Sequence, residues 1–357
     1  MYVNLLDICN PKQWKTLATN QLIENGKYDV YGANGIIGKY NDYNHTEATV
    51  LITCRGATCG NIHLSKPYSY INGNAMALDN LDESRCIKEY LYYYLKSSDL
   101  TNAISGSAQP QITIQGLKKI NLKLYDIKKQ KEIVSILKSI DKLIEKKQEE
   151  IELCSQLIKS QFVEMFGTNK KSKYPFDSLN NLSLKITDGK HGGCNSEENS
   201  GYYFVGATEI YNDKINYQTA KEITQNDFEK DYKRCDLKNN DFVIVNTGAT
   251  IGKSAIVNSA LSDHTLLQKS VALIRPKQEL ISPIYLKYCY DANPDMYNKG
   301  NGCARINLLL SQIKETMIPV PPLELQNKFA DIVKQIDKQK FVIENSLENI
   351  GKLVDLW

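Results

Sequence analysis

The sequence predicts a mixed α/β protein: two similar α/β domains separated by two long helices that pack as an antiparallel coiled coil. Three observations predict it. An internal repeat covers most of the 357 residues, each copy contains short apolar strands, and each copy ends in a long amphipathic helix. The expected domains are residues 1–126 and 168–322, and the expected helices are 127–167 and 323–357. A pseudo-two-fold axis would relate the copies.

The repeat is clearest in a Gly-Ala-Thr motif that follows an apolar strand in each copy. Residues 55–60 (Arg-Gly-Ala-Thr-Cys-Gly) correspond to residues 247–252 (Thr-Gly-Ala-Thr-Ile-Gly), at an offset of 192. Further blocks match in the same order: 74–78 with 269–273, 90–94 with 285–289, Gln130 with Gln326, and 140–142 with 336–338. Several matches in one order, with a slowly drifting offset, indicate a duplication.

The two copies differ in the segment that precedes this motif. Their starts, residues 14–17 and 176–179, match at an offset of 162, so the second copy carries about thirty extra residues. The extra segment contains residues 188–193 (Asp-Gly-Lys-His-Gly-Gly), whereas the first copy has a Gly-Asn-rich turn at 31–38. A shared fold with divergent loops suggests two related surfaces that recognise different targets.

Each copy ends in apolar residues spaced by three and four, which is typical of a coiled-coil seam. In the first helix they are Ile133, Leu137, Ile140, Ile144, Ile151, Cys154, Ile158, Phe162 and Met165; in the second they are Phe329, Val333, Ile336, Ile343, Leu347, Ile350, Val354 and Trp357. Gly167 ends the first helix, and prolines precede the second. Because the second domain starts close to Gly167, the second helix must run back along the first.

No motif in the chain predicts catalysis or a resident cofactor. Residues 248–254 (Gly-Ala-Thr-Ile-Gly-Lys-Ser) resemble a phosphate-binding loop, but three residues stand where that loop needs four. The first copy has no lysine at the matching position, so we expect a turn after a strand in both copies. The nine cysteines show no zinc-site spacing, and we predict no metal site.

Composition limits the setting in which this chain works. The net charge is only +3, so any nucleic-acid surface must be a local patch or be shared with a partner. Scattered cysteines without framework spacing are typical of a reducing compartment, and no apolar run approaches the length of a membrane helix. We therefore expect a cytoplasmic protein without a membrane partner.

Two recognition domains held apart by a helical spacer are typical of proteins that bind specific DNA sequences. Arg, Gln and Asn can each make two hydrogen bonds to one base edge, which favours them over lysines as readers. The candidate DNA-binding residues of the first copy are Asn34, Arg55, Thr58, Asn74, Gln109 and Gln111. Those of the second copy are Lys190, His191, Thr247, Thr250, Lys269 and Arg305, and Arg275 belongs to the same group of segments. Arg305 is the expected counterpart of Gln111. Ordinary turn or exposed-loop roles remain open for all of them.

With these features the chain resembles the specificity subunit of type I restriction-modification systems over essentially its whole length. The resemblance rests on the duplicated recognition domain and on residues 50–60 (Val-Leu-Ile-Thr-Cys-Arg-Gly-Ala-Thr-Cys-Gly). It also rests on the helix openings 130–133 (Gln-Lys-Glu-Ile) and 326–329 (Gln-Asn-Lys-Phe), and on 162–167 (Phe-Val-Glu-Met-Phe-Gly).

The resemblance implies a role that the residues alone do not show. Such subunits bind a bipartite double-stranded DNA site, one half per recognition domain, and contain no catalytic residues. They recruit two methyltransferase subunits, which use S-adenosylmethionine to methylate adenine N6, and a motor-nuclease subunit that uses ATP and magnesium can join. The helices are the implied docking surface, with candidate contacts at Ile133, Leu137, Phe162, Phe166, Phe329 and Trp357.

Other functions remain open at the level of sequence. The chain could be a coiled-coil scaffold that binds only proteins, or an enzyme that uses a nucleotide at residues 248–254 or is a nuclease-methyltransferase fragment. It could also serve a methyltransferase-only or a fused restriction system. DNA binding that weakens with salt separates a DNA reader from the scaffold.

Overall fold

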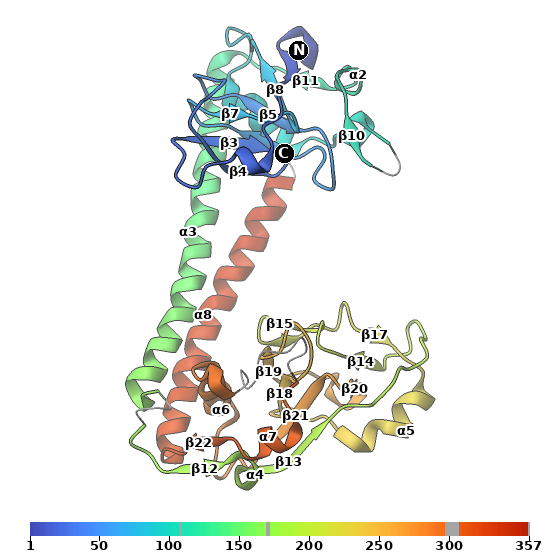
Figure 1. Cartoon of the computed structure of the whole chain (residues 1–357), viewed down its shortest axis with the longest axis vertical. Coiled ribbons are helices and arrows are strands. Elements are labelled where there is room, and N and C mark those ends of the chain that lie inside the picture. The colour runs from blue at the N-terminus through green and yellow to red at the C-terminus, as the bar shows by residue number, and fades with distance from the viewer. Residues whose placement is uncertain (107–108, 169–171, 297–306, 356–357) are drawn as a thin grey trace. The chain divides into compact units, whose positions relative to one another are not determined.

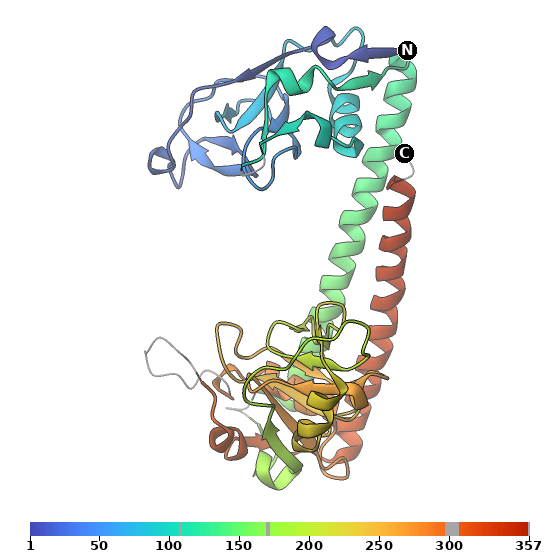
Figure 2. The ribbon, with the colours of Figure 1, turned by 90° about the vertical axis from the view of Figure 1, so that its right-hand side faces the viewer.

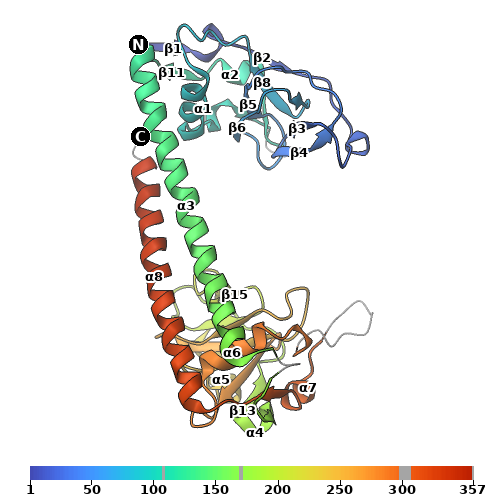
Figure 3. The ribbon, with the colours of Figure 1, turned by 90° about the vertical axis from the view of Figure 1, so that its left-hand side faces the viewer.

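The computed structural model describes residues 1–106, 109–168, 172–296 and 307–355, and it divides into two compact units. Unit 1 comprises Met1–Gln148 with Ser346–Trp357, and unit 2 comprises Glu149–Asn345. Each long helix therefore contributes one part to each unit. Figures 1–3 show the ribbon from three sides.

Unit 1 is built around a four-stranded antiparallel sheet and a smaller three-stranded sheet. The first has the order β2 (Asn10–Gln13), β8 (Ala75–Asp79), β5 (Val50–Thr53), β6 (Ile62–Leu64); the second has the order β4 (Gly35–Tyr40), β3 (Tyr28–Gly32), β7 (Tyr70–Ile71). Two short pairs join β1 (Tyr2–Asn4) to β11 (Asn121–Lys123) and β9 (Ile104–Ser105) to β10 (Gln111–Ile112). The helices are η1 (Leu5–Asp7), η2 (Thr19–Gln21), α1 (Lys88–Ser97), η3 (Thr101–Ala103) and α2 (Ile114–Leu117).

The central strand β5 explains how this unit packs. All four of its residues are buried, and successive side chains point to opposite faces of the sheet. Val50 and Ile52 join a core with Leu91 of α1, while Leu51 packs with Ile71 of β7. One face of the large sheet is thus covered by α1 and the other by the small sheet. Figure 3 shows α1 on the side of the sheet that faces α3 (Ile127–Phe166).

Unit 2 repeats both sheets in the same order. The four-stranded antiparallel sheet is β13 (Ser183–Asp188), β21 (Val271–Pro276), β18 (Phe242–Val245), β19 (Ser254–Ile256), and the three-stranded sheet is β17 (Lys221–Glu222), β14 (Tyr203–Val205), β20 (Thr265–Leu267). The short pairs are β12 (Phe176–Ser178) with β22 (Met317–Pro319) and β15 (Ile210–Tyr211) with β16 (Lys214–Ile215). The helices are α4 (Leu179–Leu182), α5 (Gln225–Cys235), η5 (Ser262–His264), α6 (Pro283–Asp291), η6 (Pro294–Met296) and α7 (Leu310–Lys314).

The matching strand orders confirm the duplication that the sequence predicts. The large sheets match strand for strand, with β5 of unit 1 and β18 of unit 2 in the same central position. In each small sheet one outer strand, β7 or β20, pairs in parallel with the middle strand.

The strand pairing corrects the predicted match between residues 14–17 and 176–179. β12 pairs with β22 as β1 pairs with β11, so Phe176 is the counterpart of Tyr2 and the offset there is 174. The second copy therefore carries 18 extra residues before the motif instead of about thirty, and α5 and the hairpin β15–β16 account for most of them (Figure 1).

The two predicted long helices are α3 (Ile127–Phe166) and α8 (Leu323–Asp355). Within unit 2 they lie side by side in opposite directions. Late in α3, the ring of Phe162 lies 5.5 Å from that of Phe329, which is early in α8. Earlier in α3, Ser155 Oγ accepts a hydrogen bond from Lys340 Nζ, later in α8, at 3.1 Å. The antiparallel direction is thus confirmed in this unit, and the two-fold relation between the copies stays a prediction.

A buried glutamine ties each long helix to its own domain. In unit 1, Gln130 Oε1 accepts from the backbone N–H of Ile87 at 2.9 Å, and its Nε2 donates to the carbonyls of Arg85 and Tyr125 at 2.7 and 2.9 Å. Both glutamines are fully buried.

In unit 2, Gln326 makes the same three hydrogen bonds. Its Oε1 accepts from the N–H of Ser282 at 2.8 Å, and its Nε2 donates to the carbonyls of Leu280 and Pro321 at 3.2 and 2.8 Å. In both units the bonded amide immediately precedes a helix, α1 or α6. The matched glutamines of the repeat are therefore equivalent in structure, and each fixes the first turn of a long helix to the helix of its own domain.

In the part of the chain that the structure describes, no helix is both long and apolar enough to cross a membrane.

Candidate nucleic-acid interface

The Gly-Ala-Thr motif of unit 1 forms a closed turn between β5 and β6. The N–H of Gly60 donates to the carbonyl of Thr53 at 2.8 Å, and the N–H of Cys59 donates to that of Gly56 at 3.0 Å. Gly56 and Gly60 have φ values of +95° and +97°, a backbone region that disfavours other residues. The spacing of the two glycines therefore follows from the shape of this turn.

Other candidate residues of the first copy gather around this turn. Arg55 forms an isolated β-bridge with Gln111, and the N–H of Cys54 donates to the carbonyl of Asn74 at 3.1 Å. Thr58 Oγ1 donates at 3.2 Å to the carbonyl of Ala33, next to Asn34 in the β3–β4 turn. The side chains of Asn34, Arg55, Asn74, Gln109 and Gln111 are exposed. Five of the six predicted residues, Asn34, Arg55, Thr58, Asn74 and Gln111, thus meet at one end of the large sheet.

The corresponding motif of unit 2 forms the same turn between β18 and β19. The N–H of Gly252 donates to the carbonyl of Val245 at 3.2 Å, and the N–H of Ile251 donates to that of Gly248 at 3.2 Å. Gly248 and Gly252 again have positive φ values, of +101° and +95°. A phosphate cradle needs backbone amides that point at the ligand. Two of these amides are used inside the turn, which supports the prediction of a turn for Thr247–Gly252.

The hydrogen bonds correct the predicted register of the repeat at two places. Asn246 donates from its N–H to the carbonyl of Ser270 at 3.0 Å, as Cys54 does to that of Asn74, so Ser270 and not Lys269 is the counterpart of Asn74.

Thr247 forms an isolated bridge with Asn307, as Arg55 does with Gln111, so Asn307 is the counterpart of Gln111. The expectation that Arg305 occupies this position is wrong by two residues, and Arg305 itself lies outside the described residues. The offset changes between 195 and 196 along the repeat, and a loop of one residue more or less leaves no mark on the motifs themselves.

The loop that follows β13, which begins at Gly189, lies beside the turn of unit 2. The N–H of Lys190 donates to the carbonyl of Leu267 at 2.7 Å, and the N–H of Lys269 donates to that of Lys190 at 2.9 Å. This pairing brings Lys190, His191 and Lys269 to the end of the sheet at which Thr247 and Thr250 lie.

The two lysines differ in what their side chains offer. Lys190 Nζ is paired with the carboxylate of Asp231, and this hydrogen bond raises the pKa of Lys190. The Lys190 charge is therefore largely compensated within the unit. Lys269 is exposed, and among the described residues its side chain takes part in no ion pair.

Arg275 does not belong to this surface. It lies near the far end of β21, where its Nε and Nη2 donate to Asp241 at 2.8 Å each and its Nη1 donates to Asp236 at 3.1 Å. Asp241 is buried, so Arg275 balances a buried charge. The expectation that Arg275 belongs with the candidate DNA-binding residues is therefore wrong.

Sequence reasoning missed Arg234, at the end of α5. Its Nε donates to the backbone carbonyl of Asp188 at 2.9 Å, and its Nη2 donates to the carboxylate of Asp188. The same Nη2 lies 3.5 Å from Nε2 of His191. No sequence motif connects residues 188 and 234, since only the folding of α5 against β13 brings them together.

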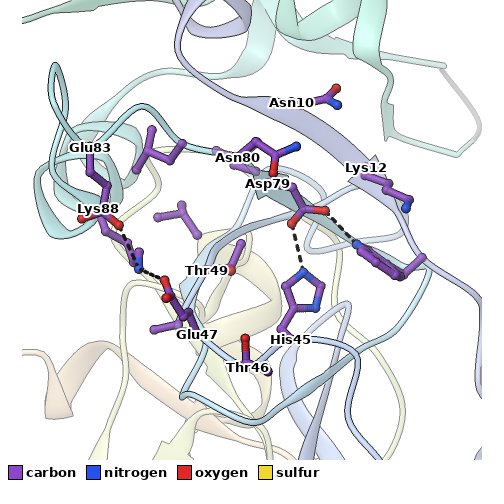
Figure 4. Close-up of a pocket in the computed structure, with 15 residues that line it drawn as sticks. Asn10, Lys12, His45, Thr46, Glu47, Thr49, Asp79, Asn80, Glu83 and Lys88 are labelled. Carbon is purple, nitrogen blue, oxygen red and sulfur yellow. Dashed lines mark hydrogen bonds and ion pairs between the residues drawn. The ribbon is translucent and has the colours of Figure 1, made fainter.

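A polar pocket of about 530 Å³ opens at the opposite end of the large sheet of unit 1 (Figure 4). Asp79 accepts hydrogen bonds from Nε1 of Trp14 at 3.0 Å and contacts Nε2 of His45 at 2.9 Å. Lys88 Nζ pairs with Glu83 at 3.1 Å and with Glu47 at 3.7 Å. The charges of this pocket compensate one another, which is consistent with a structural role.

The predicted partner contacts on the helices need a correction. Ile133, Phe162, Phe166 and Phe329 are buried in the cores of their own units, and Leu137 is partly buried. In unit 2 the rings of Phe162 and Phe166 pack against Tyr285 of α6 at 5.7 and 4.8 Å. The apolar seam of each helix thus packs against the domain of its own unit, and the four buried side chains expose no surface to a partner. Trp357 lies outside the described residues.

The helices carry other apolar side chains that are exposed in their own units. They are Ile136, Leu143, Leu153, Leu157 and Val163 on α3, and Phe341 and Val342 on α8. Within the part of the chain that the structure describes, no group of three or more His, Cys, Asp or Glu side chains is placed to hold a metal ion.

Comparison with known proteins places this duplicated frame in a family. The sequence profile of the type I restriction modification DNA specificity domain matches residues 1–153 and 189–350. Because the two matches cover most of the chain, the chain belongs to the family of type I restriction-modification specificity subunits.

Individual relatives agree with this assignment. A Mycoplasma pneumoniae protein assigned as a type I specificity subunit is 28% identical over 142 residues, which are 38% of this chain and 46% of the relative. The Escherichia coli EcoprrI specificity subunit is 28% identical over 116 residues, which are 32% of this chain and 28% of the relative. The chain thus spans less than half the length of these curated relatives.

Solved structures share the fold over the whole chain. The type I S subunit from M. genitalium superposes with a TM-score of 0.58 at 18% identity, covering 100% of this chain and 94% of that one. A chain from a study of assembly and conformational transition in the type I R-M system also gives 0.58, at 15% identity, with coverage of 100% and 95%.

Proposed function

We propose that this chain reads a bipartite, gapped DNA site, with one half of the site contacted by each recognition domain. The observation that carries the proposal is the repeated turn between the third and fourth strands of each large sheet. In both units it stands at the same sheet end, and different exposed side chains surround it: Arg55 and Gln111 in one copy, Lys269 and His191 in the other.

The residue types at these sheet ends suit the reading of bases. Arg, Gln and Asn side chains can satisfy two hydrogen-bonding groups on one base edge, whereas a lysine supplies a point charge for phosphate. Exposed Asn34, Arg55 and Gln111 therefore favour base contacts in the first copy. The exposed Lys269 favours a phosphate contact in the second.

The proposal includes partner subunits that carry out the chemistry. In this proposal the chain has no catalytic or cofactor role, and two methyltransferase subunits use S-adenosylmethionine to methylate adenine. A motor-nuclease subunit that uses ATP and magnesium can join them. The exposed apolar residues of α3 and α8, among them Leu153, Leu157 and Phe341, are the side chains that we propose as docking contacts. The net charge of +3 supports a reader that needs these partners to hold DNA tightly.

The test is to co-express the chain with its methyltransferase and to map the methylated adenines across the host genome. We expect a single motif with two specific parts separated by an unread gap of fixed length. A continuous motif without a gap would contradict the proposal. Normal assembly with the methyltransferase without any DNA affinity, even at low salt, would favour the protein-binding scaffold instead.

A further inference from the structure

The guanidinium of Arg234 is held in a fixed orientation at the edge of the candidate interface of unit 2. Its Nε donates to the backbone carbonyl of Asp188, and its Nη2 donates to the carboxylate of the same residue. Asp188 is the last residue of β13, and its side chain is only 11% exposed. Asp188 thus accepts hydrogen bonds from two of the three guanidinium nitrogens of Arg234.

The hydrogen bonds to Asp188 leave the Nη1 side of the Arg234 guanidinium available to a ligand. The side chain of Arg234 is 43% exposed, and among the described residues no hydrogen bond involves its Nη1. A guanidinium carries five N–H donors in a planar fork. The edge formed by Nη1 and the outer N–H of Nη2 can bind two acceptors side by side when a ligand replaces the 3.5 Å contact between Nη2 and Nε2 of His191.

The position of this edge matches the rest of the candidate interface. The N–H of Gly189, next to Asp188, donates to the carbonyl of Val271 at 3.1 Å. Val271 pairs with Val245, the last residue before the Asn246–Gly252 segment that contains the turn. Beyond His191, a side-chain carbon added at Gly192 or Gly193 would meet no atom within 4 Å, so no other part of the described chain covers the loop at these two positions.

The local charges favour a base edge over a phosphate as that ligand. Asp188 compensates the charge of Arg234, and its carboxylate also lies 3.5 Å from Nε2 of His191. A phosphate contact depends on uncompensated positive charge, which this cluster does not offer. A directed pair of N–H donors suits the O6 and N7 acceptors of guanine in the major groove.

We propose that Arg234 is a specificity-determining residue that recognises one guanine of the half-site read by the second domain, with Asp188 as its positioning residue. The proposal rests on the proposed function and names one contact of that same interface. Since α5 has no counterpart in unit 1, this contact belongs to the second half-site alone.

The test uses the chain assembled with its methyltransferase and measures kcat/KM for methylation of short duplexes. Each G·C pair of the second half-site is replaced in turn, and the ratio of cognate to substituted duplex is compared among Arg234→Ala, Arg234→Lys and the unchanged chain. Lys233→Ala is the matched control, because Lys233 is its exposed neighbour on the same helix end. A ratio is not altered by a loss of folded protein.

At one G·C pair, we expect the unchanged chain and Lys233→Ala to discriminate by roughly 10-fold or more, and both Arg234 variants to lose most of that ratio. Unchanged ratios at every G·C pair in Arg234→Ala would overturn the proposal. An equal loss on all duplexes would also overturn it, because it identifies a phosphate contact. Failure of the proposed function is separate: the unchanged chain would then show no two-part motif.

Discussion

At the scale of single residues, the structure separates side chains that are free to contact DNA from those already engaged in the protein. Lys190 and Lys269 are neighbours through their backbones, yet of the two only Lys190 has a carboxylate partner, Asp231, among the described residues. Arg275 and Arg234 differ in a similar way. The nitrogens of the Arg275 guanidinium are all bonded to Asp236 or Asp241, whereas Nη1 of Arg234 has no hydrogen-bond partner among the described residues. Availability, more than residue type, distinguishes the candidate readers.

This difference predicts unequal effects of two lysine substitutions on DNA binding. Lys269→Ala should reduce the slope of log affinity against log salt by about 1, because one phosphate contact and its released counterion are lost. Lys190→Ala should leave the slope nearly unchanged, since its charge is already compensated by Asp231. Fluorescence anisotropy of the assembled complex over a series of salt concentrations measures both slopes. Equal reductions in the two variants would contradict this account of the site.

Much of the candidate site could be predicted from the sequence because it is duplicated. The two glycines that need positive φ mark the turn in each copy, and the residues next to them are therefore found by alignment. Arg234 could not be found in this way. It belongs to the unduplicated α5 and reaches Asp188 across 46 residues of chain.

At the scale of elements, each long helix is attached to its own domain by equivalent buried hydrogen bonds. Gln130 and Gln326 each satisfy one backbone N–H and two carbonyls, next to the start of α1 or α6. Tyr90 and Tyr285 repeat a second attachment, since each hydroxyl donates to a backbone carbonyl of the strand that precedes the long helix, at 2.6 and 2.8 Å. The start of each helix is thereby fixed relative to its sheet.

Loss of one glutamine should destabilise its unit strongly. Gln130→Leu removes the hydrogen-bond partner of the Ile87 N–H and of two carbonyls, all partly buried. A fully buried group without a partner costs about 1–3 kcal/mol, and partial access to water lowers that cost. We expect a clear fall in the midpoint of urea unfolding, measured by circular dichroism. Lys131→Leu at the exposed next position is the control and should change stability by less than about 0.5 kcal/mol. Equal midpoints for the two variants would argue against the attachment.

The two long helices could be predicted because apolar residues spaced by three and four persist along them. The surface against which this apolar face packs could not be predicted. Phe162 and Phe329 were expected to face a partner subunit, and instead they form an aromatic cluster with Tyr285 of α6. Spacing shows which face of a helix is apolar. It does not show whether that face is covered by the second helix, by the domain or by another chain.

At the scale of the whole molecule, the chain consists of two units with the same strand order and different loops. The shared frame explains why one family profile matches twice, at residues 1–153 and 189–350. The differences are concentrated at the sheet ends, where unit 1 has the β3–β4 turn and unit 2 has α5 and the loop at His191. Such an arrangement allows each half of a DNA site to be read by its own set of side chains.

The central claim is that the two domains read their half-sites independently, and a segment exchange tests it most directly. Residues 27–61, which include Asn34, Arg55 and Thr58, are replaced by the matching segment of a relative with a different DNA motif, and the methylated genome is sequenced. We predict that one half of the gapped motif changes while the other half and the gap stay the same. A motif altered in both halves, or in neither, would contradict the account.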